Sequence, residues 1–141
     1  EVFNPGSVDV DLLGWTLADL GSDSHLVSTS AVVPAGGFAV LGNNADPATN
    51  GGAPVLYRYG GYSLANGDDE IVLIAPDGSV VDQVVYDGGP GFPDGNGAAA
   101  SLSGPLANAI DNDLGSSWCL ATGPMPGGDL GTPGGPNPAC P

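Results

Sequence analysis

Short apolar runs separated by turn residues recur along the whole chain. Apolar side chains occupy alternate positions from Val8 to Leu12, and Val-rich or Leu-rich runs return at residues 71–74 and 80–86. A period of two is typical of strands that bury one face, and no segment sustains a helical period. The pattern therefore predicts an all-β protein.

The clearest local element is a hairpin over residues 70–86. Pro76 fixes φ at a turn position, and Gly78 accepts the left-handed conformation that a bulged hairpin requires. The apolar residues expected to face one another across it are Ile71, Leu73, Val81 and Val85, although the sequence leaves the register open.

Length and composition are those of one domain rich in turns. The 141 residues include 25 Gly and 14 Pro, a level that is typical of disorder when no strand pattern is present. Here the strand pattern is present, and it favours a β-sandwich. We expect the sandwich to occupy residues 1–122 and a Pro/Gly-rich tail to occupy residues 123–141.

The charge balance excludes several partners. The net charge is −15, and Arg58 is the only strong base. Nucleic acid binding needs clustered Lys and Arg, so nucleic acid is not an expected partner. No apolar stretch reaches the roughly 18 residues of a membrane helix, so no membrane insertion is expected.

Two cysteines, Cys119 and Cys140, are predicted to form one disulfide. The bridge would close a loop of about 20 residues, stabilise the fold by on the order of 3 kcal/mol, and fix the tail to the strand after Trp118. Zinc is a poor alternative, because two cysteines and a single distant histidine do not supply four ligands. The disulfide favours an extracellular or cell-surface location.

Several motifs resemble, in the same order, those of bacterial lamin-tail domains. They lie at residues 4–6 (Asn-Pro-Gly), 13–17 (Leu-Gly-Trp-Thr-Leu), 34–42, 63–68, 71–74, 80–86, 100–102, 116–119 and 131–137 (Gly-Thr-Pro-Gly-Gly-Pro-Asn). The resemblance implies an immunoglobulin-like β-sandwich. It also implies a non-enzymatic, secreted structural or interaction module whose partners are proteins, either other copies or the parent polypeptide.

The sequence departs from the family pattern at its N-terminal end. Family members open with a strand and a loop before the segment that begins here at Glu1, so the first strand is expected to be missing. A fragment or processed product is one explanation. The other is that a neighbouring copy donates the strand, which gives a head-to-tail contact that grows into a filament.

Catalysis is not expected. His25 is the only side chain whose ordinary pKa lies near neutrality, and its neighbours Ser22, Asp23 and Ser24 contain the atom types of a triad. Residues adjacent in sequence rarely point at one another, and no Gly-x-Ser-x-Gly motif is present. We place His25 in a polar connector over residues 21–30.

No cofactor is required, and calcium is the one ion that the sequence suggests. Three acidic loops, at residues 68–70, 94–96 and 111–113, offer oxygen ligands. The favoured site combines Asp111 and Asp113 with Asn108, because alternate residues in a loop can converge. Neither Asp94 nor Asp111 is followed by the closing Glu of a calcium-binding EF-hand loop, and capped turns explain the same residues without an ion.

Tyr57 and Tyr59 share one face of a predicted strand, and Tyr62 follows closely. Exposed, coplanar rings would bind sugar, which makes a carbohydrate-binding accessory domain of a secreted hydrolase the alternative function, with polysaccharide as the partner. Rings packed beneath the neighbouring loop are the other interpretation.

Overall fold

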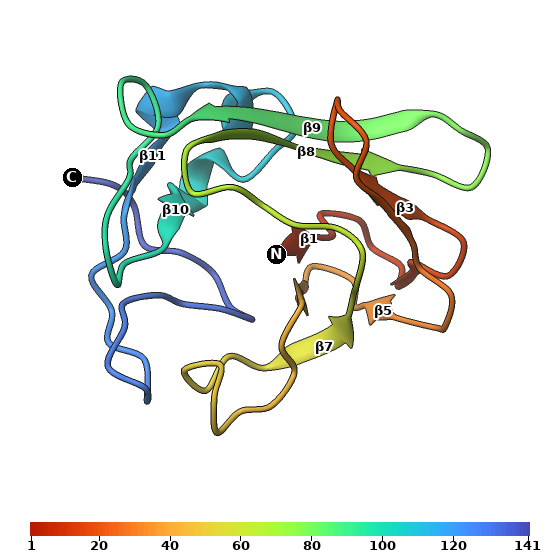
Figure 1. Ribbon diagram of the computed structural model, residues 1–141, viewed down its shortest axis with the longest axis horizontal. Helices are drawn as coiled ribbons and strands as arrows, with labels where there is room; N and C mark the ends of the chain where they lie inside the picture. The colour runs from red at the N-terminus through yellow and green to blue at the C-terminus, as the bar shows by residue number, and fades with distance from the viewer.

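The computed structural model describes residues 1–141 and is all-β, as predicted (Figure 1). It contains eleven strands and three short 3-10 helices, η1 to η3. The strands are β1 (Val2–Phe3), β2 (Val10–Asp11), β3 (Thr16–Ala18), β4 (Ser24–Leu26), β5 (Val32–Val33), β6 (Phe38–Gly42), β7 (Val55–Arg58), β8 (Asp68–Ile74), β9 (Val80–Asp87), β10 (Ala100–Leu102) and β11 (Trp118–Leu120). The 3-10 helices are η1 (Gly104–Leu106), η2 (Asp111–Asp113) and η3 (Gly115–Ser117).

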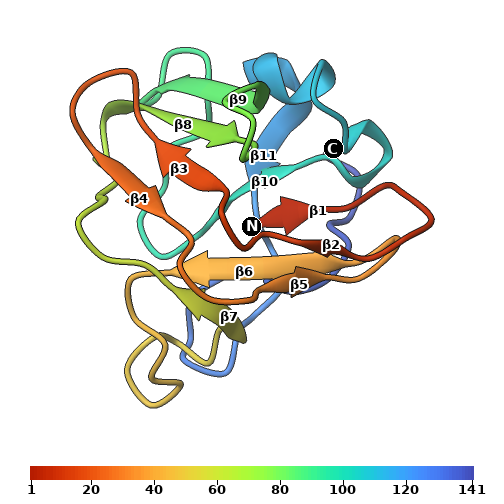
Figure 2. The same ribbon diagram turned by 90° about the vertical axis from the view of Figure 1, so that its right-hand side faces the viewer.

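The strands form the layers of an immunoglobulin-like sandwich. One layer is the antiparallel sheet β4-β3-β8-β9, and the other contains the sheet β1-β6-β7 with the pair β2-β5 (Figure 2). A further antiparallel pair, β10-β11, follows in the C-terminal part of the chain. Strands β6 and β7 run parallel, whereas the other pairs are antiparallel.

The predicted hairpin is present as β8 and β9, and Gly78 adopts the left-handed conformation with φ of 87°. The register, which the sequence leaves open, places Ile71 opposite Val84 and Leu73 opposite Asp82. A register shift between Leu73 and Ile74 inserts one extra residue, Val81, into β9. Residues that lie directly opposite share a face, so Asp82 lies on the same face as Leu73.

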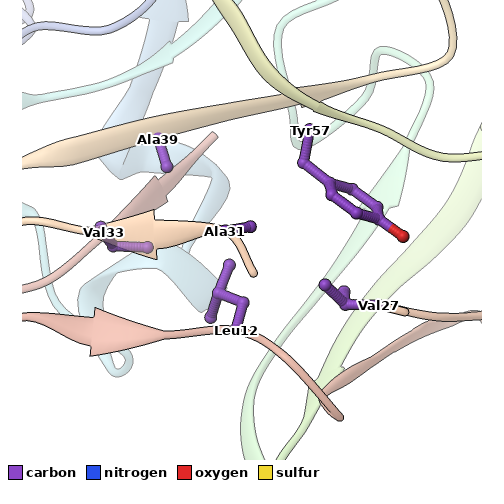
Figure 3. Close-up of a cluster of buried hydrophobic side chains, with 6 residues drawn as sticks. All are labelled: Leu12, Val27, Ala31, Val33, Ala39 and Tyr57. Carbon is purple, nitrogen blue, oxygen red and sulfur yellow. The ribbon is translucent and has the colours of Figure 1, made fainter. Parts of the chain in front are cut away.

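The core is small, with ten buried hydrophobic residues. Six of them form one cluster: Leu12, Val27, Ala31, Val33, Ala39 and Tyr57 (Figure 3). Trp15, expected as a core anchor, is partly buried and packs against this cluster. Full burial of one Leu or Val stabilises the fold by about 1.5–3 kcal/mol, so a core this small leaves little excess stability.

In the Asn-Pro-Gly motif, the side chain of Asn4 connects the turn after β1 to β5. The buried amide of Asn4 donates from Nδ2 to the carbonyl oxygens of Val8 and Val33, at 2.8 and 3.1 Å. Its Oδ1 accepts the N–H of Gly6 at 3.0 Å. One side chain therefore closes the turn after β1 and attaches that turn to β5.

The C-terminal tail lies against the sandwich. The predicted disulfide between Cys119 and Cys140 is confirmed, with the two Cα atoms 5.8 Å apart. Asn137 donates from Nδ2 to the carbonyl of Leu102 at 3.0 Å, and Gly127 donates its N–H to the carbonyl of Gly51 at 3.1 Å. The tail thus contacts both β10 and the loop before β7.

Candidate functional site

His25 lies in β4 and not in a connector, since residues 24–26 pair with β3 despite their polar character. Its Nδ1 is 2.8 Å from the carbonyl oxygen of Gly60, which can only accept, so Nδ1 carries the proton. The N–H of Gly60 is 3.4 Å from the same nitrogen, a longer contact that a protonated Nδ1 cannot accept. The second ring nitrogen, Nε2, is therefore an acceptor in the neutral ring.

Tyr57 completes this network from β7. Its hydroxyl lies 2.9 Å from Nε2 of His25, so it donates to the ring, and it accepts the N–H of Ser28 at 3.1 Å. Tyr57 is only 8% exposed. Every polar atom of the pair thus has a partner within the chain, which is typical of a structural network.

The triad suggested by neighbouring residues does not form. Asp23 accepts the hydroxyl of Ser63 at 2.9 Å and its N–H at 3.3 Å. The hydrogen bonds of His25 go to Tyr57 and Gly60 instead. A base and an orienting carboxylate are therefore not brought together at His25.

The tyrosine rings do not form a flat, exposed platform. Tyr59 and Tyr62 meet edge to face, with centroids 5.4 Å apart and an interplanar angle of 74°. Tyr62 is buried, donates its hydroxyl to the carbonyl of Glu70 at 3.3 Å, and has a pKa raised by that burial. Sugar binding by Tyr57 and Tyr59 stays a prediction, without the coplanar arrangement that would favour it.

The favoured calcium residues lie in and before η2. The Oδ1 of Asn108 accepts the N–H groups of Ile110 and Asp111, both at 3.0 Å, and its Nδ2 donates to Asp111 Oδ2 at 2.7 Å. Asn108 thus closes a turn, and its side-chain oxygen is already used. No group of three or more His, Cys, Asp or Glu side chains is placed to hold a metal ion. Calcium at Asp111 and Asp113 stays a prediction.

One polar contact lay outside the sequence-based expectations. Asn112 of η2 is buried, and its Nδ2 donates to Asp82 Oδ2 of β9 at 2.8 Å. The only signal in the sequence is that Asp82 interrupts an apolar run. Its partner lies 30 residues away, in a loop with no periodic pattern.

The family model of the lamin tail domain matches residues 1–88. The chain belongs to the lamin tail domain family. The match spans β1 to β9 of the lamin tail domain, whereas the motifs at residues 100–102, 116–119 and 131–137 lie beyond it. Searches of curated proteins and of solved structures find no match. The family is a structural, immunoglobulin-like one, consistent with a non-enzymatic module.

No helix of this lamin tail domain has the length and apolar character needed to cross a membrane.

Proposed function

We propose that this lamin tail domain is a non-enzymatic, extracellular or cell-surface module that assembles with other copies by accepting a strand. Three features support the proposal: the structural character of the family, the disulfide between Cys119 and Cys140, and the acidic surface. Disulfides persist in oxidising environments, and one strong base cannot form a phosphate-binding patch. The expected partner is therefore a protein.

The observation that carries this proposal is the exposed surface. The domain exposes 7621 Å², whereas a folded monomer of 13.7 kDa exposes about 6,600 Å². The excess of about 1,000 Å² is comparable to the roughly 800 Å² that each partner buries in a standard protein interface. This excess supports the proposal that a partner completes the fold.

The edge of β1 is the place where such a partner would add a strand. β1 pairs with β6 on one side, and no other strand of the chain pairs with it. The N–H of Asn4 bonds to the carbonyl of Gly37, so the alternation of an antiparallel ladder directs the N–H and C=O of Phe3 away from β6. The edge has no strand partner within the chain, and unpaired edges favour strand addition.

The test compares two substitutions of Phe3 by light scattering coupled to gel filtration over a wide range of protein concentrations. Phe3→Pro removes the outward N–H, and Phe3→Leu keeps it. Both lose the ring that stacks on Phe38, with centroids 4.7 Å apart, so the pair is matched for this loss.

We expect the wild-type domain and Phe3→Leu to associate with rising concentration, and Phe3→Pro to remain monomeric. A wild-type domain that is monomeric at every concentration would contradict self-assembly. Equal association of the two variants would place the contact elsewhere than at β1.

A further inference from the structure

At the junction between β9 and η2, the carboxyl of Asp82 and the amide of Asn112 are joined by one hydrogen bond, and two of their oxygen atoms have no donor. Asn112 is 6% exposed, and its Nδ2 donates to Asp82 Oδ2 at 2.8 Å. The remaining oxygen of each side chain, Oδ1 of Asp82 and Oδ1 of Asn112, is buried and has no hydrogen-bond partner. Buried acceptors are rarely left in this condition, because an unmade hydrogen bond in a protein interior is costly.

Neither a water molecule nor a cationic side chain has a place against these two oxygen atoms. Each exposes less than 1 Å², so no water-sized space adjoins either oxygen. Cationic side chains do not face them: Asp82 lies opposite Leu73 of β8, and η2 brings the carboxylate of Asp113 near. Arg58, the only strong base, donates from Nε to the carbonyl of Asn43.

We propose that Asp82 and Asn112 form a buried proton-binding site, in which Asp82 is protonated at Oδ1 and donates to Asn112 Oδ1. The acid and the amide then form two hydrogen bonds, and one proton taken from solvent on folding satisfies both acceptors. Desolvation is the largest influence on the pKa of Asp82 and raises it; hydrogen bonds from Asn112 and from the backbone of Gln83 lower it, and the negative charge of Asp113 raises it again. The net direction is upward, as this state requires.

The site connects the segment matched by the family model to the part of the chain beyond it. Asp82 lies within residues 1–88, and Asn112 lies outside them. The carbonyl of Asn112 also accepts the indole N–H of Trp118 at 2.8 Å, and Trp118 precedes the disulfide-bonded Cys119. Protonation of Asp82 therefore adds a second hydrogen bond between η2 and the sheet, beside the one that Asn112 Nδ2 donates.

The sign of the pH dependence follows from the raised pKa. The folded state holds the proton more tightly than the unfolded state, so this contribution is fully present below the unfolded pKa. It is lost as the pH rises through the folded pKa of Asp82. Across that interval the unfolding equilibrium constant should rise by up to about tenfold per pH unit.

The first test is a carbon-detected NMR titration of the aspartate carboxyl groups in the intact wild-type domain. We expect Asp82 to titrate at a higher pH than the other aspartates, and Asp113→Asn to lower its midpoint by removing the neighbouring charge. A midpoint of Asp82 at or below those of the exposed aspartates would overturn the proposal.

The second test uses Asp82→Asn, whose amide can form the same two hydrogen bonds without a titrating proton. We expect this variant to be at least as stable as the wild-type domain at neutral pH and to lose the pH-dependent step. The matched control, Asp94→Asn, removes one charge from an exposed loop and should keep that step.

A bound cation is the rival explanation, and the same variants exclude or establish it. Stabilisation of the wild-type domain by calcium chloride, absent in Asp82→Asn, together with a lower stability of that variant, would overturn protonation in favour of a metal. If Asp82→Asn does not fold, the wild-type NMR titration decides alone.

Discussion

The hydroxyl of Tyr57 lies 2.9 Å from Nε2 of His25, and this contact joins β7 of one layer to β4 of the other. In the neutral ring with its proton on Nδ1, Nε2 accepts and the tyrosine hydroxyl is the donor. The same hydroxyl accepts the N–H of Ser28. The one histidine of the chain, which is the natural suspect for catalysis, is therefore part of the frame that holds the two layers together.

Removal of that hydroxyl should weaken the fold. Tyr57→Phe removes the partner of Nε2 of the half-buried His25 and of the N–H of the exposed Ser28, so we expect a loss of about 0.5–1.5 kcal/mol in the free energy of unfolding. Urea denaturation measures this loss. Tyr59→Phe is the control, since no intramolecular hydrogen bond involves its hydroxyl, and a loss as large in the control would contradict the assignment.

The disulfide should be present in the untreated protein and should stabilise it. Intact mass with and without reductant should differ by two hydrogen atoms, and alkylation before reduction should label no thiol. Cys140→Ser should lower the free energy of unfolding by about 3 kcal/mol. Two alkylatable thiols in unreduced protein would remove both the bridge and the main support for an extracellular location.

A close approach between η1 and the tail predicts a sensitive glycine. A Cβ at Gly104 would overlap the backbone carbonyl oxygen of Asn137, so Gly104→Ala must displace the tail. We expect a loss of about 1–3 kcal/mol, as for other overpacked sites. Gly60→Ala is the matched control, because nothing lies within 4 Å of its Cβ. Thermal melting of both variants checks the contrast, and equal melting temperatures would contradict it.

The sequence predicts those features whose causes are local. The turn at Gly78 and the alternating strands follow from φ preferences and the period of two, and the disulfide follows from the presence of two cysteines. The register of β8 and β9 does not follow from the sequence, because a bulge shifts the pairing by one residue. The contact of Asp82 with Asn112 cannot be predicted either, since it depends on the conformation of a loop that has no periodic pattern.

The calcium hypothesis has a direct test in the same loop. Calcium added to chelator-stripped protein should raise the melting temperature by mass action if Asp111 and Asp113 bind it, and Asp113→Asn should reduce the shift. The Oδ1 of Asn108 already closes its turn, and Asp111 Oδ2 already accepts from Nδ2 of Asn108, so calcium binding at Asp111 would have to compete with that hydrogen bond. No shift at millimolar calcium would leave these residues as turn caps.

Self-assembly of this domain should strengthen as the salt concentration rises. Each copy carries a net charge of −15, so two copies repel before any strand can pair. Raising the ionic strength shortens the Debye length from about 30 Å at 0.01 M to about 8 Å at 0.15 M, which weakens this repulsion while backbone hydrogen bonds at β1 are unaffected. We expect association, measured by sedimentation equilibrium, to strengthen across that range in the wild-type domain and to stay absent in Phe3→Pro. Association that weakens with salt would contradict this prediction, because it would indicate attraction between opposite charges. Two copies with one Arg and 16 acidic residues each do not attract one another in this way.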